Sequence, residues 1–81
     1  DLEDKKLFYD SKTILQEMVQ AEKGGEIRYR LTGEEGPDHN KSFCVEVLIG
    51  ESVYGDGCGR TKKAAEQQAA YRAILKLRKQ G

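Results

Sequence analysis

Alanines at helical spacing near the C-terminal end constrain the fold of this 81-residue chain most strongly. Residues four apart lie on one face of an α-helix, so the spacing predicts a helix over residues 61–79, with Thr61 as its N-cap. Because alanine side chains are small, this helix can lie close to the sheet predicted for the preceding residues. The stripe on its buried face consists of Ala65, Ala69, Ala73 and Leu77, with Ala70 and Ile74 beside it.

Three earlier segments alternate apolar and polar residues, which is the period of a half-buried strand. The first begins at Ile27, the second covers about 42–49, and the third is short and begins at Val53 before a glycine-rich stretch. A polar loop over residues 33–41 joins the first two strands and is too long for a tight hairpin turn.

A second helical pattern follows Asp10, a suitable N-cap, and ends at Gly24-Gly25. Its apolar residues cluster on one side, at Ile14, Leu15, Met18 and Val19. Polar residues occupy the opposite side, at Thr13, Gln16, Glu17 and Gln20. The predicted order is therefore α-β-β-β-α, an α+β fold with two helices packed on one face of a three-stranded antiparallel sheet.

The length suits one small domain, and the charge is unevenly divided along it. Residues 1–40 carry six Lys or Arg against ten Asp or Glu, and residues 41–81 carry eight against four. The basic half indicates either a local anion site or only a solvated basic helix. No apolar run approaches the ~18 residues of a membrane-spanning helix, and because the N-terminus is charged we expect no signal peptide there. Because the first residue is not methionine, we expect a fragment of a longer protein.

Cys44 and Cys58 are too few for a disulfide framework and wrongly spaced for a zinc site. Gly50-Glu51 fits a two-residue turn, and counting outward from it pairs residue 44 with 57 and residue 43 with 58. The two cysteines would then point to opposite faces of the hairpin, whereas a disulfide needs facing Cβ atoms ~4 Å apart. We therefore predict two free thiols in a cytoplasmic protein.

Residues suited to catalysis are scarce. The only histidine, His39, lies in the polar loop, and no G-x-S-x-G motif supplies a nucleophile. The adjacent acids Glu3-Asp4 and Glu34-Glu35 are typical of solvated segments. The G-x-G-x-G run at residues 55–59 lacks the P-loop spacing and ends an antiparallel hairpin. We expect no catalytic site, metal or cofactor in this chain.

Lys62 and Lys63 stand in the first turn of the C-terminal helix, where the helix dipole disfavours cations. A helix N-terminus also offers unpaired N–H groups to an anion. A bound phosphate would account for both lysines, and two solvated lysines tolerated at a small cost in stability are the alternative.

Three blocks of the sequence resemble the double-stranded-RNA-binding domain family, in the order in which that family carries them. Residues 59–70 match its K-K-x-A-x-x-x-A-A signature, residues 36–41 (G-P-D-H-N-K) match its loop between the first two strands, and residues 12–17 match its first helix. The resemblance covers residues 10–78. The particular residues in the three blocks are most similar to those of the C-terminal domain of bacterial ribonuclease III.

The resemblance implies a domain that binds duplex RNA by shape, touching two minor grooves and the phosphates between them. The polar face of the first helix would meet one minor groove, the loop would meet the second, and the lysines would meet the phosphates. The implied RNA-binding residues are Thr13, Gln16, Glu17, Gln20, Pro37, His39, Asn40, Arg60, Lys62 and Lys63, with Lys41 as a weaker candidate.

The resemblance also implies the organisation of a longer protein. Residues 1–9 would be a linker or the end of a preceding nuclease domain, residues 10–79 the RNA-binding domain, and residues 80–81 a tail. The parent protein is expected to be a ribonuclease III that cleaves duplex RNA in RNA processing, including that of ribosomal RNA. Its nuclease domain would hold Mg²⁺ and form a homodimer in the cytoplasm, with no membrane partner.

The main alternative is a degenerate domain of the same fold that binds proteins instead of RNA. The intact Lys62, Lys63 and His39 argue against it. A small stand-alone enzyme is disfavoured because the sequence lacks a catalytic cluster. A single-strand binder is disfavoured because no aromatic pair stands on an open strand face to stack bases.

Overall fold

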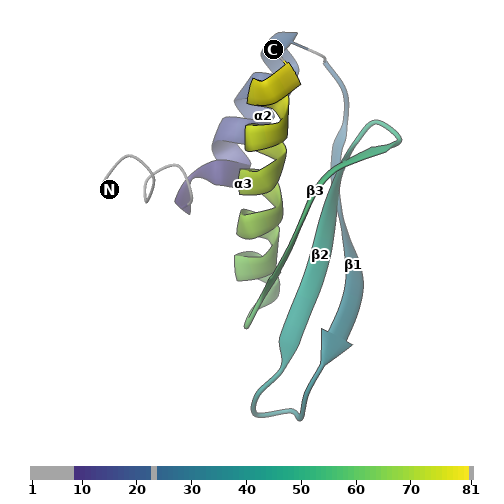
Figure 1. Ribbon diagram of the computed structural model, residues 1–81, viewed down its shortest axis with the longest axis vertical. Coiled ribbons are helices and arrows are strands. Elements are labelled where there is room, and N and C mark those ends of the chain that lie inside the picture. The colour runs from purple at the N-terminus through teal and green to yellow at the C-terminus, as the bar shows by residue number, and fades with distance from the viewer. Residues whose placement is uncertain (1–8, 23, 81) are drawn as a thin grey trace.

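The computed structural model describes residues 9–22 and 24–80. Its elements, in chain order, are α2 (Ser11–Glu22), β1 (Ile27–Glu35), β2 (Ser42–Ile49), β3 (Ser52–Gly59) and α3 (Lys62–Gln80). The antiparallel strands form one layer, and both helices cover the same face of it (Figure 1). The predicted α+β architecture is confirmed.

The predicted linker, residues 1–9, lies outside the described residues except for Tyr9, and α3 reaches Gln80, the first residue of the predicted tail. No helix among the described residues is long and apolar enough to cross a membrane.

The ends of α2 follow from its flanking residues. The Asp10 carbonyl oxygen accepts a hydrogen bond from the Ile14 N–H at 2.9 Å, as an N-cap residue does. At the other end Gly24 adopts a φ of 66°, and its N–H donates to the Val19 carbonyl oxygen at 2.6 Å. Such a left-handed glycine satisfies carbonyl groups that the last helical turn leaves unpaired.

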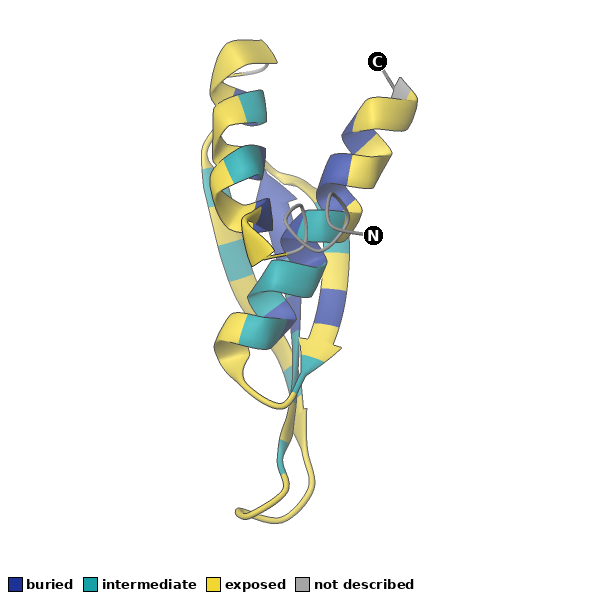
Figure 2. Cartoon of the chain, turned by 90° about the vertical axis from the view of Figure 1, so that its left-hand side faces the viewer, coloured by how far each residue is buried: buried dark blue, intermediate teal, exposed yellow. Residues whose placement is uncertain are grey.

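The core lies between the sheet and the two helices. Its members are almost fully buried because they occupy the inward face of β2 and the facing stripes of α2 and α3 (Figure 2). They are Leu15, Val19, Val47, Ile49, Ala69, Ala70, Ala73, Ile74 and Leu77. The alanine stripe is therefore the buried face of α3, as its spacing predicts.

β1 is longer than its alternation predicts. The strand continues to Glu35, so the connecting loop covers residues 36–41 and the predicted start of that loop was wrong. The pairing with β2 is irregular between Leu31 and Gly33. A bulge at this point interrupts the two-residue period, which is why a simple alternation pattern ends too early.

β3 is also longer than predicted. It covers Ser52–Gly59, so the glycine-rich stretch after Val53 belongs to the strand. The turn before it has the predicted form, because Ile49 pairs with Ser52 and Gly50 adopts a φ of 65°. Glycine takes this left-handed conformation without a steric penalty.

A bulge in β3 sets the register of its second half. Leu48 lies opposite Val53, whereas Val47 lies opposite Gly55, so Tyr54 is the extra residue on β3. Tyr54 is half-buried and packs against the core. One extra residue moves every later side chain of the strand to the other face of the sheet.

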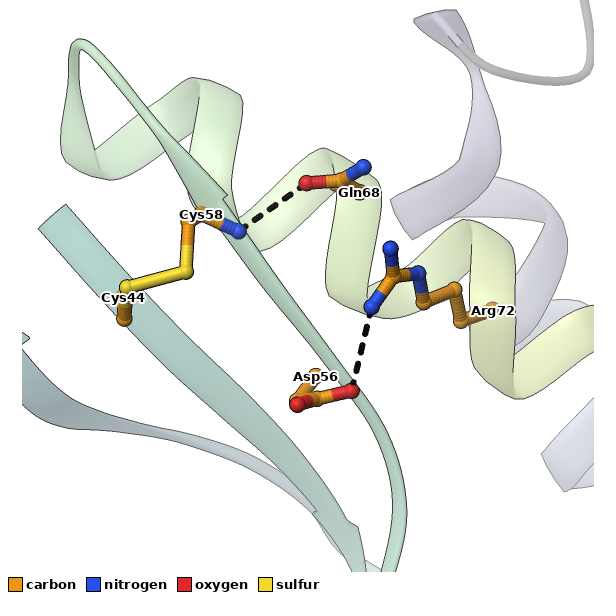
Figure 3. The surroundings of a disulfide bond; sticks show 5 residues. All are labelled: Cys44, Asp56, Cys58, Gln68 and Arg72. Atoms are coloured by element: carbon orange, nitrogen blue, oxygen red, sulfur yellow. Dashed lines mark hydrogen bonds and ion pairs between the residues drawn. A yellow bond between two sulfur atoms is a disulfide. The ribbon is translucent and has the colours of Figure 1, made fainter. Parts of the chain in front are cut away.

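This shift brings Cys44 directly opposite Cys58, with their Cα atoms 4.1 Å apart. The two residues form a disulfide (Figure 3). The prediction of two reduced thiols was wrong because counting outward from the turn assumed an uninterrupted ladder, and the bulge at Tyr54 interrupts it.

The same shift turns the glycines of β3 towards α3. A Cβ atom at Gly55, Gly57 or Gly59 would lie only 2.4–2.8 Å from the nearest atom of α3. Small residues on both sides, glycine on the strand and alanine on the helix, therefore allow α3 to lie directly against β3.

Candidate nucleic-acid interface

The first candidate surface is the polar face of α2. Its apolar residues Leu15 and Val19 are buried, which leaves the opposite side of the helix in solvent. All four predicted contact residues on that side are exposed, namely Thr13, Gln16, Glu17 and Gln20. They present a hydroxyl group, two amides and one carboxylate, which can donate to and accept from hydroxyl groups.

The second candidate surface is the loop between β1 and β2. Pro37, His39 and Asn40 are exposed at its tip, and the hairpin that carries them extends beyond both helices (Figures 1 and 2). The loop has internal order, because the Asn40 N–H donates to the Pro37 carbonyl oxygen at 2.9 Å. Lys41 Nζ lies 3.8 Å from carboxylate oxygens of both Glu34 and Asp38, so this weaker candidate is engaged within the hairpin.

The third candidate surface is the start of α3. Thr61 caps the helix as predicted, because its Oγ1 accepts a hydrogen bond from the Ala64 N–H at 3.0 Å. Arg60, Lys62 and Lys63 are all exposed. The position of these cations at the helix start follows directly from the cap.

The cations of this third surface are available to an anion. Among residues 9–22 and 24–80, no carboxylate forms an ion pair with Arg60, Lys62 or Lys63. Lys62 Nζ lies 6.0 Å from the centre of the Phe43 ring, at the outer limit of a cation–π contact. As the sequence predicts, Lys62 and Lys63 lie at the N-terminal end of α3, which is the positive end of the helix dipole, and they form no ion pair there with any described residue.

The three surfaces are arranged in series along the molecule. The start of α3 lies between α2 and the β1–β2 loop along the long axis, in both views (Figures 1 and 2). A polar helix face, a cationic helix start and a polar loop thus follow one another.

Sequence reasoning missed a fourth group, which connects the helices. Lys12 on α2 forms an ion pair with Glu66 on α3, and its Nζ also lies 4.9 Å from the centre of the Tyr29 ring on β1. Burial raises the pKa of Tyr29 to about 12, and the charge of Glu66 adds to this rise. The available signal was Glu66, the single acid among the cations of residues 60–79.

The arrangement offers no metal site in the part of the chain that the structure describes. No group of three or more His, Cys, Asp or Glu side chains comes together there. His39 is exposed at the loop tip.

The sequence model of one family, described as the double-stranded RNA binding motif, matches residues 11–77. The chain belongs to this family. The matched range begins at the first residue of α2 and ends in α3, so the motif includes all three candidate surfaces. This match confirms the resemblance in sequence.

Relatives of the motif carry the name Ribonuclease 3. The chain is 51% identical over 71 residues to the protein of Caldanaerobacter subterraneus subsp. tengcongensis, covering 88% of the chain and 31% of the relative. It is 49% identical over 76 residues to that of Pelotomaculum thermopropionicum (94% and 32%). It is 53% identical over 68 residues to that of Listeria monocytogenes serovar 1/2a (84% and 30%). The chain thus spans about a third of the length of the curated relatives it matches.

Proposed function

We propose that this double-stranded RNA binding motif holds duplex RNA through its three surfaces at once. The observation that carries the proposal is their serial arrangement, with the unpaired cations of α3 between α2 and the β1–β2 loop. Domains of this family span ~16 bp and touch two successive minor grooves and the phosphates of the major groove between them. A polar surface on α2, a cationic surface at the start of α3 and a polar loop thus follow one another in the same order as a minor groove, the phosphates of the major groove and the next minor groove.

Each surface suits the part of the duplex that it would meet. The amides of Gln16 and Gln20 can bond to 2′-hydroxyl groups and base edges in the shallow minor groove. Glu17 would be repelled by phosphate but can accept a hydrogen bond from a 2′-hydroxyl, which DNA lacks. His39 would enter the second minor groove, flanked by Pro37 and Asn40.

Lys62 and Lys63 would contact phosphate oxygens across the major groove, with Arg60 beside them. A phosphate here would meet both the lysines and the unpaired N–H groups of the helix start. Such contacts carry no base specificity, so the domain would select duplex RNA by shape.

We further propose that the motif is the substrate-holding part of a ribonuclease III. The support is the name of its relatives and the share of their length that it matches. The motif would raise the local concentration of duplex RNA for a nuclease domain that holds Mg²⁺ and forms a homodimer. The whole protein would act in the cytoplasm on RNA precursors, including those of ribosomal RNA.

A gel-shift experiment tests the binding proposal. The chain is mixed with a ~20 bp RNA duplex, long enough for the ~16 bp site, and in parallel with a DNA duplex of the same sequence. We expect the RNA duplex to be retained and the DNA duplex to be retained weakly or not at all. Equal retention of both would contradict shape-specific binding, and retention of neither would favour the protein-binding alternative.

A further inference from the structure

Two of the proposed RNA-binding surfaces are joined by a small polar network. Lys12 Nζ on α2 lies 2.5 Å from Glu66 Oε1 on α3. Beside this pair, Ser11 Oγ donates a hydrogen bond to the Gln67 carbonyl oxygen at 2.8 Å, and Gln67 Nε2 donates to the Tyr9 carbonyl oxygen at 3.1 Å. Consecutive residues of α3 thus bond to the start of α2.

Lys12 contacts two partners. Its ammonium group pairs with the Glu66 carboxylate and lies 4.9 Å from the centre of the Tyr29 ring. Burial raises the pKa of Tyr29 to about 12, so its phenol stays protonated beside the ammonium group even in alkaline buffer. Glu66 is the less exposed partner, with 28% of its side chain accessible against 43% for Lys12. The network therefore ties α2, α3 and β1 together at one point.

The network lies next to both contact surfaces. Lys12 directly precedes Thr13, the first contact residue of α2. Glu66 follows Lys62 by four residues and Lys63 by three, and residues at these spacings are neighbours on a helix surface. A shift of α2 relative to α3 would change the distance between the minor-groove face and the phosphate-binding lysines.

We propose that Glu66 is a positioning residue that, through Lys12, sets the spacing between α2 and the start of α3 so that both fit one duplex. The proposal rests on the proposed function. Once one of the two surfaces has bound the duplex, binding of the other surface is intramolecular. The second surface adds to the affinity only if the spacing of the helices lets both surfaces contact the duplex together. Glu66 acts on affinity by holding that geometry without touching RNA.

The positioning role and simple electrostatics predict opposite changes in RNA affinity when the charge of Glu66 is removed. Removing a negative charge beside Lys62 and Lys63 should strengthen binding to any polyanion, and it would also free Lys12 to meet a phosphate. If Glu66 positions the helices, Glu66→Gln should instead weaken binding to the ~20 bp RNA duplex by about 3- to 5-fold, the scale of one lost ion pair.

The salt dependence gives a second readout. Each phosphate contact contributes roughly one unit to the slope of log affinity against log salt. Glu66→Gln removes no cation, yet the slope should fall by about one because one phosphate contact is no longer made simultaneously. A purely electrostatic role would leave the slope unchanged or raise it.

Asp56→Asn is the matched control. It also removes one acid and one ion pair to α3, the Asp56–Arg72 pair at 3.3 Å (Figure 3), away from the proposed contacts. We expect this variant to bind RNA as tightly as the wild type or slightly more tightly. Urea unfolding of each variant confirms that the protein assayed is folded.

A double-variant cycle separates positioning from direct contact. If Lys12 serves only as the partner of Glu66, adding Glu66→Gln to Lys12→Gln should cause no further loss of affinity. A further loss, or Glu66→Gln binding as tightly as the wild type, would overturn the positioning role. So would equal weakening by Glu66→Gln and Asp56→Asn. Failure of the wild type to bind the RNA duplex would instead overturn the proposed function, and this role with it.

Discussion

Replacement of Gly57 by alanine tests the close contact between β3 and α3. A Cβ atom at this position would lie 2.6 Å from the Ala69 backbone nitrogen, 2.6 Å from the Gln68 Cβ and 2.8 Å from the Ala65 carbonyl oxygen. Two of these three atoms are backbone, so no change of rotamer can relieve the clash. α3 would have to move away from the sheet by about 1 Å to restore ordinary contact distances.

The size of the effect follows from two opposing contributions. Overpacking a well-packed core costs about 1–3 kcal/mol, and a clash with backbone belongs at the upper end of that range. Replacing glycine by alanine also restricts the unfolded chain, which restores about 0.4–1 kcal/mol. We expect a net loss of about 2–3 kcal/mol, out of a total free energy of unfolding of roughly 4–12 kcal/mol for a chain of this length. The melting temperature should fall by about 10–20 °C.

Gly33→Ala is the control for this measurement. A Cβ at Gly33 would meet no atom within 4 Å, and its φ is not in the left-handed region. The control should be neutral or stabilised by up to about 1 kcal/mol. Urea unfolding followed by circular dichroism, with the disulfide intact, compares the two variants. If they differ by less than about 0.5 kcal/mol, the inferred contact between β3 and α3 is not as close as the structure has it.

Three further predictions concern the RNA contacts and the disulfide. Lys62→Ala with Lys63→Ala should weaken duplex-RNA binding for all sequences and lower the salt slope by roughly one to two units, measured by titration at several salt concentrations. Wild-type affinity at moderate salt would refute the phosphate contacts. Glu17→Ala should bind duplex RNA more weakly and duplex DNA equally or slightly more tightly, since it loses a charge-assisted hydrogen bond of about 1.5–3 kcal/mol but relieves repulsion; tighter binding to both would make Glu17 a bystander. Reduction of Cys44–Cys58 should lower the free energy of unfolding by up to about 3 kcal/mol, and two free thiols by mass spectrometry under oxidising conditions would contradict the register of β2 and β3.

The helix faces could be predicted from the sequence because their periodicity is local. The spacing of Leu15 and Val19 fixes which side of α2 is buried, and so which side is exposed. The cap at Thr61 likewise fixes the helix turn that contains Lys62 and Lys63. The exposure of the candidate contact residues follows from these local patterns, without knowledge of the tertiary structure.

The register of β3 could not be predicted from one strand alone. The alternation of β3 does not mark its bulge, because Tyr54 is compatible with either face and the glycines that follow have no side chains to alternate. The usable signal lay in two segments together. Gly55, Gly57 and Gly59 recur with the period of a strand face, and only a face of glycine can lie against the alanine face of α3. The glycine face of β3 can face α3 only if the strand contains a bulge before Gly55.

The ion pair between Lys12 and Glu66 could not be predicted from the sequence, for a different reason. The two residues are 54 positions apart, and their contact depends on how α2 crosses α3. Crossing geometry is set by the summed packing of both helices on the sheet, which no local pattern encodes.

The bulge at Tyr54 therefore affects the proposed RNA contacts as well as the core. Without it, Asp56 and Cys58 would face α3 in place of Gly57, and neither side chain fits in the space that Gly57 leaves. α3 could not then lie against β3, and Lys62 and Lys63 at its start would lie further from the sheet that carries the β1–β2 loop. Close-packed backbone leaves α3 little room to slide, so the glycine contact fixes it on the side of the sheet while the Lys12–Glu66 pair fixes it on the side of α2. Disturbing either contact should weaken RNA binding, but only the glycine contact should greatly reduce the free energy of unfolding, because the ion pair is exposed.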